Sequence, residues 1–252
     1  MPVVLVSSAL LGLLAGGFLH VAIERLPRGE PLITAASRCT RCGRVLTPAE
    51  RVPLMGFALQ RGRCPGCGAP SGWTRPLVEL GAAAAFSCAA AAGGTGPRGA
   101  ALAALFGTLI VAVFTDLRHR IIPNAVSLWG FVLVLAADAW GGPAMLLRGL
   151  EGAAAAGGIM LLLNVVSGGR MGMGDVKLSA VIGAALGVEL GLLALLIGFL
   201  AGSAAGLALV AARKKRLKDY IPFGPALAFG AWTAALWGPR LLAWYAALGR
   251  VS

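Results

Sequence analysis

Long apolar runs, repeated along the whole chain, constrain its fold more than any other feature. Each covers roughly 16–23 residues, and about 20 apolar residues are enough for a helix to cross the hydrocarbon core of a bilayer. Only 13% of the residues are charged, whereas soluble domains carry about 25%. The sequence therefore predicts an all-α polytopic membrane protein with about eight transmembrane helices. The expected spans cover residues 3–23, 77–93, 100–115, 125–140, 145–166, two stretches within 178–212, and 222–248.

The run at residues 178–212 allows two interpretations. A single helix would place the basic cluster at residues 213–218 outside the cell, whereas two shorter spans that turn near Glu189 keep it inside. We expect two spans, although the first is short for a full crossing. The run that begins the chain lacks a basic leader and is long for a cleaved signal peptide, so we expect it to be a retained helix.

Small residues are abundant in these runs, and the chain has 37 glycines. Three glycine pairs have the spacing at which small helix faces allow close approach in lipid. We expect these pairs to serve packing rather than chemistry. They are Gly12/Gly16, Gly183/Gly187 and Gly198/Gly202.

The one long polar segment covers residues 24–76, and we call it the cysteine segment. It holds nine Arg, no Lys and three Glu. Because basic residues are enriched in cytoplasmic loops, this composition places the segment in the cytoplasm and the N-terminus outside. The same rule accounts for the net charge of +12. We therefore divide the chain into a first transmembrane helix (residues 1–23), the cysteine segment and a seven-helix membrane domain (residues 77–248).

Four of the five cysteines lie in this segment as two Cys-x-x-Cys pairs separated by 21 residues. Paired thiolates at such spacing are typical of a structural zinc site. The segment has few apolar residues, so a metal would supply folding energy that a core cannot. A reducing compartment argues against disulfides. We expect zinc on Cys39, Cys42, Cys64 and Cys67, and we expect Cys88 to be a buried small hydrophobe.

An arginine-rich zinc ribbon is also a pattern for nucleic-acid binding. The cysteine segment, however, offers only Phe57 and Trp73 for base stacking. That alternative also leaves the two aspartates described next without a role. We therefore expect no nucleic-acid partner, and we expect contact with membrane lipid; the oligomeric state stays open.

Two aspartates lie where polar loops meet apolar runs. Asp175 follows two glycines in the stretch MGMGDVKL (residues 171–178), and Asp116 begins a polar loop that ends at Asn124. Counting the crossings places both aspartates on the cytoplasmic side. A carboxylate at a membrane boundary is costly unless water, a partner or a function keeps it there. The glycines leave backbone uncovered, so another chain can approach Asp175 closely.

A pair of carboxylates suits the attack of water on an amide. The ionised member takes a proton from water, and the protonated member donates to the carbonyl oxygen. Structural alternatives exist, because Asp175 suits a helix N-cap and Asp116 suits a cap or a partner of Arg118 or Arg120. Two other functions also stay open. A transporter would carry protons or cations on these carboxylates, and a scaffold would dock a cytoplasmic protein on the cysteine segment.

An ordered set of motifs, spread over almost the whole chain, resembles the type IV prepilin peptidases, which are intramembrane aspartic proteases of the Gly-x-Gly-Asp class. The motifs are GMGDVKL (172–178), FTDL (114–117) with IIPN (121–124), GFL (17–19) with RLP (25–27), both cysteine pairs, PLVEL (76–80) and IPFGP (221–225). Two places depart from the family pattern. His20 stands where Asn is usual, and ERVP (50–53) stands where Asp-x-Ile-Pro is common.

The resemblance implies that Asp116 and Asp175 are the catalytic aspartates, with Gly172, Gly174 and Lys177 in the active-site loop. It implies an enzyme of the bacterial inner membrane that cleaves the basic leader of prepilins or pseudopilins on the cytoplasmic side, for a type IV pilus or a type II secretion system. It further implies N-methylation of the new N-terminus by S-adenosylmethionine. The sequence shows no Rossmann-type glycine motif for this donor, and we assign no residue to it.

Overall fold

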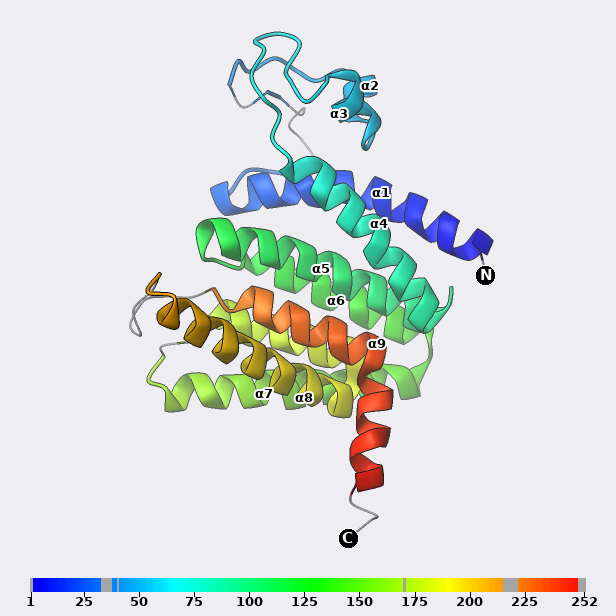
Figure 1. Cartoon of the computed structure of the whole chain (residues 1–252). Helices are drawn as coiled ribbons and strands as arrows, with labels where there is room; N and C mark the ends of the chain where they lie inside the picture. Colours follow the sequence, from blue (N-terminus) through cyan, green and yellow to red (C-terminus); the bar gives the residue numbers. More distant parts are fainter. Residues whose placement is uncertain (1, 33–37, 40, 170, 215–221, 249–252) are drawn as a thin grey trace.

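The apolar runs form helices. A computed structural model of the chain describes residues 2–32, 38–39, 41–169, 171–214 and 222–248, and nearly all of its regular structure is helical (Figure 1). The all-α prediction is thereby confirmed. The elements are α1 (Pro2–Arg25), the 3-10 helix η1 (Leu26–Arg28), α2 (Pro48–Arg51), α3 (Met55–Leu59), α4 (Thr74–Gly93), α5 (Pro97–His119), α6 (Asn124–Trp140), α7 (Pro143–Val166), α8 (Met173–Ala211) and α9 (Gly224–Leu248).

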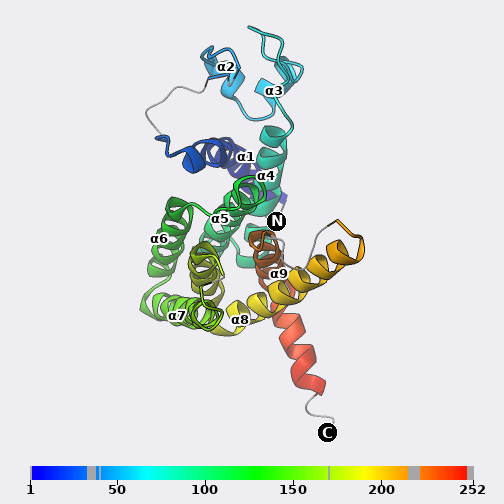
Figure 2. The ribbon, with the colours of Figure 1, turned by 90° about the vertical axis from the view of Figure 1, so that its left-hand side faces the viewer.

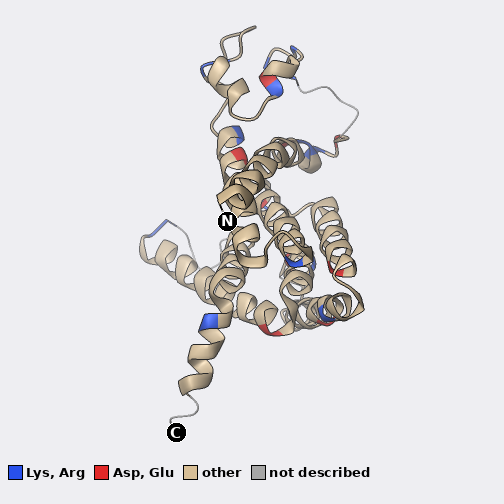
Figure 3. Ribbon diagram, turned by 90° about the vertical axis from the view of Figure 1, so that its right-hand side faces the viewer, with Lys and Arg blue, Asp and Glu red and all other residues tan. Residues whose placement is uncertain are grey.

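Within the described ranges, five helices are long and apolar enough to cross a membrane. They are α1 with its 3-10 extension, α4, α5, α7 and α8, whereas α6 is apolar but shorter. Charged positions are sparse along the bundle helices and denser in the cysteine segment (Figure 3). These features indicate a multi-pass membrane protein.

Two helices extend further than the apolar runs that predicted them. α5 continues to His119, so Asp116 lies in its last turn and not in a loop, as the sequence had suggested. α8 begins at Met173, which makes Asp175 its third residue. Backbone hydrogen bonds continue a helix past the last apolar side chain, so an apolar run marks the membrane core and not the helix ends.

The central helix of the bundle is α5, which carries Asp116. It contacts α1, α4, α6, α8 and α9, and its buried side chains form much of the core together with those of α8 and α9. Phe106 of α5 stacks on Trp232 of α9, with ring centroids 4.1 Å apart. α1 lies at the periphery, where Leu10 and Leu14 are exposed as expected of a lipid-facing helix.

Close helix packing depends on glycine, as predicted for five of the six paired glycines. A Cβ at Gly12 would lie 2.4 Å from the carbonyl oxygen of Ala82 in α4. A Cβ at Gly183 would lie 2.1 Å from the carbonyl oxygen of Gly152 in α7. Backbone fills the space at these points, so a side chain would separate the helices. Similar close contacts with α4 or α9 surround Gly16, Gly198 and Gly202.

Gly187 has a second role that the sequence did not predict, because it breaks α8. Its φ of 79° and ψ of −178° are not helical and are open essentially only to glycine. The two halves of α8 fold back on each other, since a Cβ at Gly191 would lie 3.0 Å from the Cα of Gly183. The turn therefore lies at Gly187 and not near Glu189. In Figure 1 the second half, in gold, returns toward the end at which the first half begins.

Helix ends from distant parts of the chain meet at one end of the bundle. Arg118, in the last turn of α5, donates to Glu24 at the end of α1 and to Thr74 at the start of α4. Lys177, in α8, donates from Nζ to Oδ1 of Asn124, at the start of α6, at 2.7 Å. We call this the aspartate end, because both aspartates also lie there.

The cysteine segment projects from the bundle beyond α1 and α4 (Figures 1 and 2). A buried carboxylate fixes it to α4. Glu79 is 0% exposed and accepts from Nε of Arg75 at 2.8 Å and from the backbone N–H of Leu54 at 2.7 Å. The Arg75 guanidinium also donates to the backbone carbonyls of Glu50 and Arg51, each at 2.9 Å. The segment is thereby held against the first turns of a membrane helix.

Candidate active site

Asp116 lies where α5 meets α9, and it is only 2% exposed. The backbone N–H of Gly224, the first residue of α9, donates to its Oδ2 at 2.8 Å. Arg118 instead contacts Glu24 and Thr74, so the suggested pairing of Asp116 with Arg118 is wrong. The carboxylate is thus positioned by a backbone amide 108 residues further along the chain.

Asp175 lies in the first turn of α8 and is 6% exposed. Its backbone N–H donates to the carbonyl of Gly172 at 3.0 Å. Gly172 is the N-cap residue. Asp175 is therefore not the helix cap that the sequence offered as an alternative, and capping does not account for its buried carboxylate.

Both aspartates line one cavity of about 220 Å³ at the aspartate end. The rest of the lining comes from the loop after α5 and from the start of α8. A water molecule takes up about 30 Å³ of liquid, so the cavity has room for water and for part of a peptide. The other lining residues are Arg120, Ile121, Ile122, Gly172, Met173 and Gly174.

The two glycines beside Asp175 keep this cavity compact. A Cβ at Gly174 would lie 2.9 Å from the Cβ of Ile122. The chain that approaches this glycine is therefore the protein's own loop after α5. A Cβ at Gly172 would lie 3.3 Å from Oδ2 of Asp175. Side chains at either position would press on the carboxylate or push away the loop that adjoins it.

Lys177 lies outside the set of residues that line the cavity. Its Nζ donates to Oδ1 of Asn124, so it joins the second turn of α8 to the first residue of α6. Lys177 therefore lies two residues after Asp175, which lines the cavity, and contacts the start of α6.

The two Cys-x-x-Cys pairs form turns of the same design. In the first turn, the N–H of Gly43 donates to the carbonyl of Cys39 at 2.9 Å, and in the second, Gly68 donates to Cys64 at 2.8 Å. Both glycines have positive φ, at 71° and 68°, which glycine adopts without strain. The fifth cysteine, Cys88, is half-buried against the bundle core and not fully buried as expected.

The four cysteine sulfurs lie within 4.8 Å of one another. The Cys39–Cys67 and Cys42–Cys64 sulfur pairs are each 3.9 Å apart. A tetrahedral zinc ion with Zn–S bonds of about 2.3 Å separates its sulfurs by about 3.8 Å, so the cluster is compatible with structural zinc. The backbone amides of Cys42 and Arg41 donate toward Cys39, which lowers the pKa of its thiol to about 6 and favours the metal-binding thiolate.

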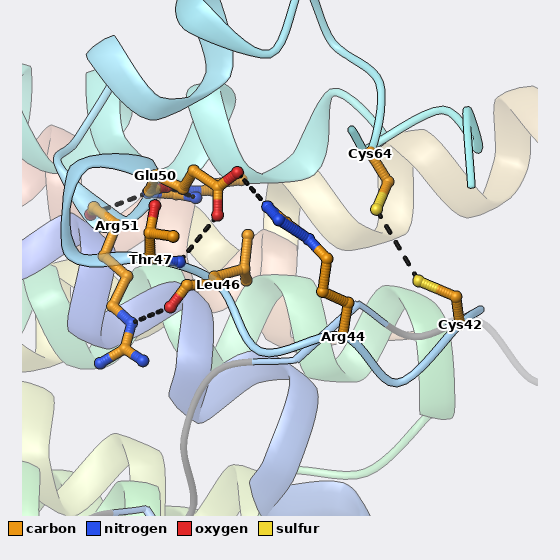
Figure 4. A network of polar contacts seen from close by, with 8 residues as sticks. Cys42, Arg44, Leu46, Thr47, Glu50, Arg51 and Cys64 are labelled. Carbon is orange, nitrogen blue, oxygen red and sulfur yellow. Dashed lines mark hydrogen bonds and ion pairs between the residues drawn. The ribbon is translucent and has the colours of Figure 1, made fainter. Parts of the chain in front are cut away.

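A polar network supports the first cysteine turn (Figure 4). Arg44 donates to the carboxylate of Glu50, and the backbone N–H of Thr47 donates to the same carboxylate at 2.7 Å. The hydrogen bond from Arg44, followed by that from Thr47, lowers the pKa of Glu50. Nε of Arg51 donates to the carbonyl of Leu46 at 3.0 Å. The network joins the turn to α2, which Arg75 in turn fixes to α4.

Known proteins match this chain over almost its whole length. The model of the bacterial peptidase A24 N-terminal domain matches residues 10–92, and that of the type IV leader peptidase family matches residues 103–207. A Bacillus subtilis protein named prepilin leader peptidase/N-methyltransferase is 32% identical over 240 residues, which cover 93% of this chain and 94% of the relative. The chain belongs to the prepilin leader peptidase family.

Other members of the prepilin leader peptidase family agree with this assignment. The relatives of the same name from Aeromonas hydrophila and Pseudomonas aeruginosa are 34% and 33% identical, and each alignment covers 94% of this chain and 91% of the relative. No solved structure matches the chain. The resemblance identified from the sequence motifs is thereby confirmed, and the transporter alternative gains no support.

Several residues at this site had no role assigned from the sequence. Gly224 holds Asp116, and Ile122 packs on Gly174. Arg120 lines the cavity with a left-handed φ of 56° where α5 ends. Gly224 and Ile122 belong to the IPFGP and IIPN motifs, so the family resemblance marked these segments without showing what they contact.

Proposed function

We propose that this protein is a membrane aspartic endopeptidase that cleaves the basic leader from type IV prepilins or pseudopilins and then N-methylates the new N-terminus. The observation that carries the proposal is the cavity shared by Asp116 and Asp175, in a chain whose relatives are named prepilin leader peptidase/N-methyltransferase. The apparatus served is a type IV pilus or a type II secretion system.

In the proposed reaction the two aspartates share one proton, since two close carboxylates do not readily both ionise. The ionised member takes a proton from water, whose oxygen attacks the carbonyl carbon of the peptide. The protonated member donates its proton to the carbonyl oxygen. When the resulting tetrahedral intermediate collapses, the C–N bond breaks and the leaving amine receives a proton from the pair. We treat the pair as a unit and give neither residue a fixed role.

The surrounding backbone holds this pair in place. The amide of Gly224 orients Asp116, and the contact between Gly174 and Ile122 sets the position of Asp175 relative to the loop after α5. Gly172, Gly174 and Lys177 therefore act as supports in the active-site loop. Orientation of this kind matters because small displacements of reacting groups cost large factors in rate.

We infer eight crossings, made by α1, α4, α5, α6, α7, the two halves of α8, and α9. The fold-back at Gly187 supports two crossings within α8. The second half returns to the aspartate end, where a Cβ at Gly202 would lie 2.9 Å from the ring of Phe223, next to Gly224. We expect the basic cluster at residues 213–218 to lie on the cytoplasmic side after the second half of α8, but part of this cluster lies outside the described residues. We retain the three-part division into residues 1–23, 24–76 and 77–248.

The aspartate end would face the cytoplasm, because the arginine-rich cysteine segment leaves and re-enters the bundle there. A prepilin would approach with its basic leader in the cytoplasm and its apolar helix in the bilayer. Cleavage at the membrane boundary separates the two parts.

Zinc would be held by Cys39, Cys42, Cys64 and Cys67. Its role would be structural, because four thiolates leave no open coordination position. The methyl donor, S-adenosylmethionine, supplies the transferred methyl group when bound. The cavity at the aspartate end contains the aspartate pair. A second cavity, between α8 and α9, lacks polar side chains that could bind this donor. We assign no residue to the donor.

The test uses the purified full-length chain in detergent and a synthetic peptide with a basic leader followed by an apolar segment. We expect mass spectrometry to show the leader and the mature part as separate products. With S-adenosylmethionine present, the mature part should become heavier by one methyl group. An intact peptide, with protein that is folded and carries zinc, would overturn the proposed function.

A further inference from the structure

The segment where α9 begins lies beside both Asp116 and a second cavity. The backbone N–H of Gly224 donates to Asp116. Its neighbours Phe223 and Pro225 line this second cavity of about 300 Å³. We call this the α8–α9 cavity. Its remaining lining residues are Pro222 and Ala226, and Ala201, Gly202 and Ala205 of α8.

The α8–α9 cavity suits an apolar side chain. All of its lining residues are apolar, so a polar or charged group would lose its hydrogen bonds to water on entering. An engineered apolar cavity of about 150 Å³ binds benzene, and this cavity is about twice as large. One large aliphatic or aromatic side chain therefore fits.

Small residues on α8 keep this space open. Ala201, Gly202 and Ala205 lie on one face of the helix, because residues four apart are neighbours on its surface. A Cβ at Gly202 would lie 2.9 Å from a ring carbon of Phe223. Phe223 also contacts the ring of Phe199, with centroids 5.2 Å apart. The Phe223 ring is therefore held by Phe199 and by the backbone at Gly202.

We propose that the α8–α9 cavity binds the apolar side chain of one of the first two substrate residues after the scissile bond. This inference rests on the proposed function. The carbonyl that is attacked must lie at the aspartates, and the cavity begins one residue from the amide that contacts Asp116. An extended chain advances about 3.3–3.6 Å per residue, so the side chain that reaches the cavity belongs to a residue close to the cleaved bond.

The charge of the leader indicates on which side of the scissile bond this substrate residue lies. The leader is basic, and its side chains would be poorly solvated among apolar residues. The residues after the bond begin the apolar helix of the substrate. The cavity therefore selects the start of the mature part, and it acts as a specificity site for cleavage.

The test compares peptides that differ only in carrying Leu or Ala at the first or the second position after the scissile bond. The wild-type chain should cleave the Leu peptide with a kcat/KM about 10-fold or more above that of the Ala peptide at one of these positions. Ala205→Phe fills the cavity and should bring this ratio close to one. Ala204→Phe is the matched control, since Ala204 is the neighbouring residue on α8 and lies outside the lining, and it should keep the wild-type ratio. Ala201→Leu fills the same space from the preceding turn if Ala205→Phe does not fold.

The outcomes separate this inference from the proposed function. If the wild-type chain cleaves the Leu and Ala peptides equally well at both positions, or if filling the cavity leaves the ratio unchanged, the cavity is not the specificity site, while peptidase activity stands. A cavity occupied by a lipid acyl chain would give this result. If no peptide is cleaved at all, the proposed function fails and the inference fails with it.

Discussion

Glu79→Ala should release the cysteine segment from the bundle. The Glu79 carboxylate is fully buried and accepts from Arg75 and from the backbone of Leu54. Removing one partner of a buried ion pair costs about 3–5 kcal/mol, because the charge of Arg75 and the amide of Leu54 lose their acceptor. Since each 1.4 kcal/mol changes an equilibrium about tenfold, the detached form of the segment should become on the order of 100- to 1,000-fold more populated.

Limited proteolysis with trypsin measures this population, because the cysteine segment contains nine arginines. At low protease concentration the rate of cutting follows the fraction of open molecules. The matched control is Glu24→Ala, since the Glu24 side chain is 29% exposed and pairs with the half-exposed Arg118. Such exposed pairs contribute about 0–1 kcal/mol, so this variant should be cut only slightly faster than wild type. Equal cutting rates for the two variants would show that the Glu79 carboxylate does not hold the segment against α4.

Three further predictions concern glycines and cysteines. Gly187→Ala should lower the Tm in detergent, since its φ of 79° strains an L-residue by about 1–3 kcal/mol. Gly158→Ala is the control, because nothing lies within 4 Å of the new Cβ. Equal Tm values for the two variants would contradict the non-helical backbone at Gly187. Cys39→Ser should reduce bound zinc from about one ion per chain to nearly none by metal analysis, while Cys88→Ser keeps it; a zinc-loaded Cys39→Ser variant would exclude the four-cysteine site. Gly224→Ala places a Cβ 2.8 Å from the carboxylate oxygen that its amide holds and should lower kcat about 10- to 100-fold. An unchanged kcat would show that this contact does not position the carboxylate.

The sequence alone predicted the features that depend on local pattern. Apolar run length predicted the helices, and counting the crossings placed Asp116 and Asp175 on one side, as they lie in the structure. The spacing of the cysteines predicted one cluster, because Cys-x-x-Cys pairs fold into tight turns whatever surrounds them. The helices and the cysteine cluster needed only the chain near the residues concerned, and the side of the aspartates needed only the number of spans between them.

Contacts between distant helices could not be predicted in this way. The bond from Gly224 to Asp116 joins α9 to α5, and no local pattern shows which glycine amide faces which carboxylate. Gly183 and Gly187 have the same spacing as true packing pairs, yet Gly187 is a backbone break. Its role depends on a sharp fold-back that lets α7 pack against the first half of α8 and α9 against the second.

The α8–α9 cavity also has no signature in the sequence. Small residues line it from two helices, and the same residues would equally suit tight packing. The structure shows in addition that Phe223, against Phe199 and beside Gly202, forms one side of the space. The sequence marked the IPFGP motif through family resemblance, and the structure gives two of its residues distinct contacts.

The catalytic role of the aspartate pair is tested by the rate at which Asp116→Asn and Asp175→Asn variants cleave the leader peptide, measured by product mass. Asn keeps the size and polarity of Asp but cannot relay a proton, so we expect each variant to lose at least about 1,000-fold in kcat. Unchanged zinc content and Tm would confirm that both variants fold. Cleavage near the wild-type rate by either folded variant would contradict the aspartate pair as the catalytic centre.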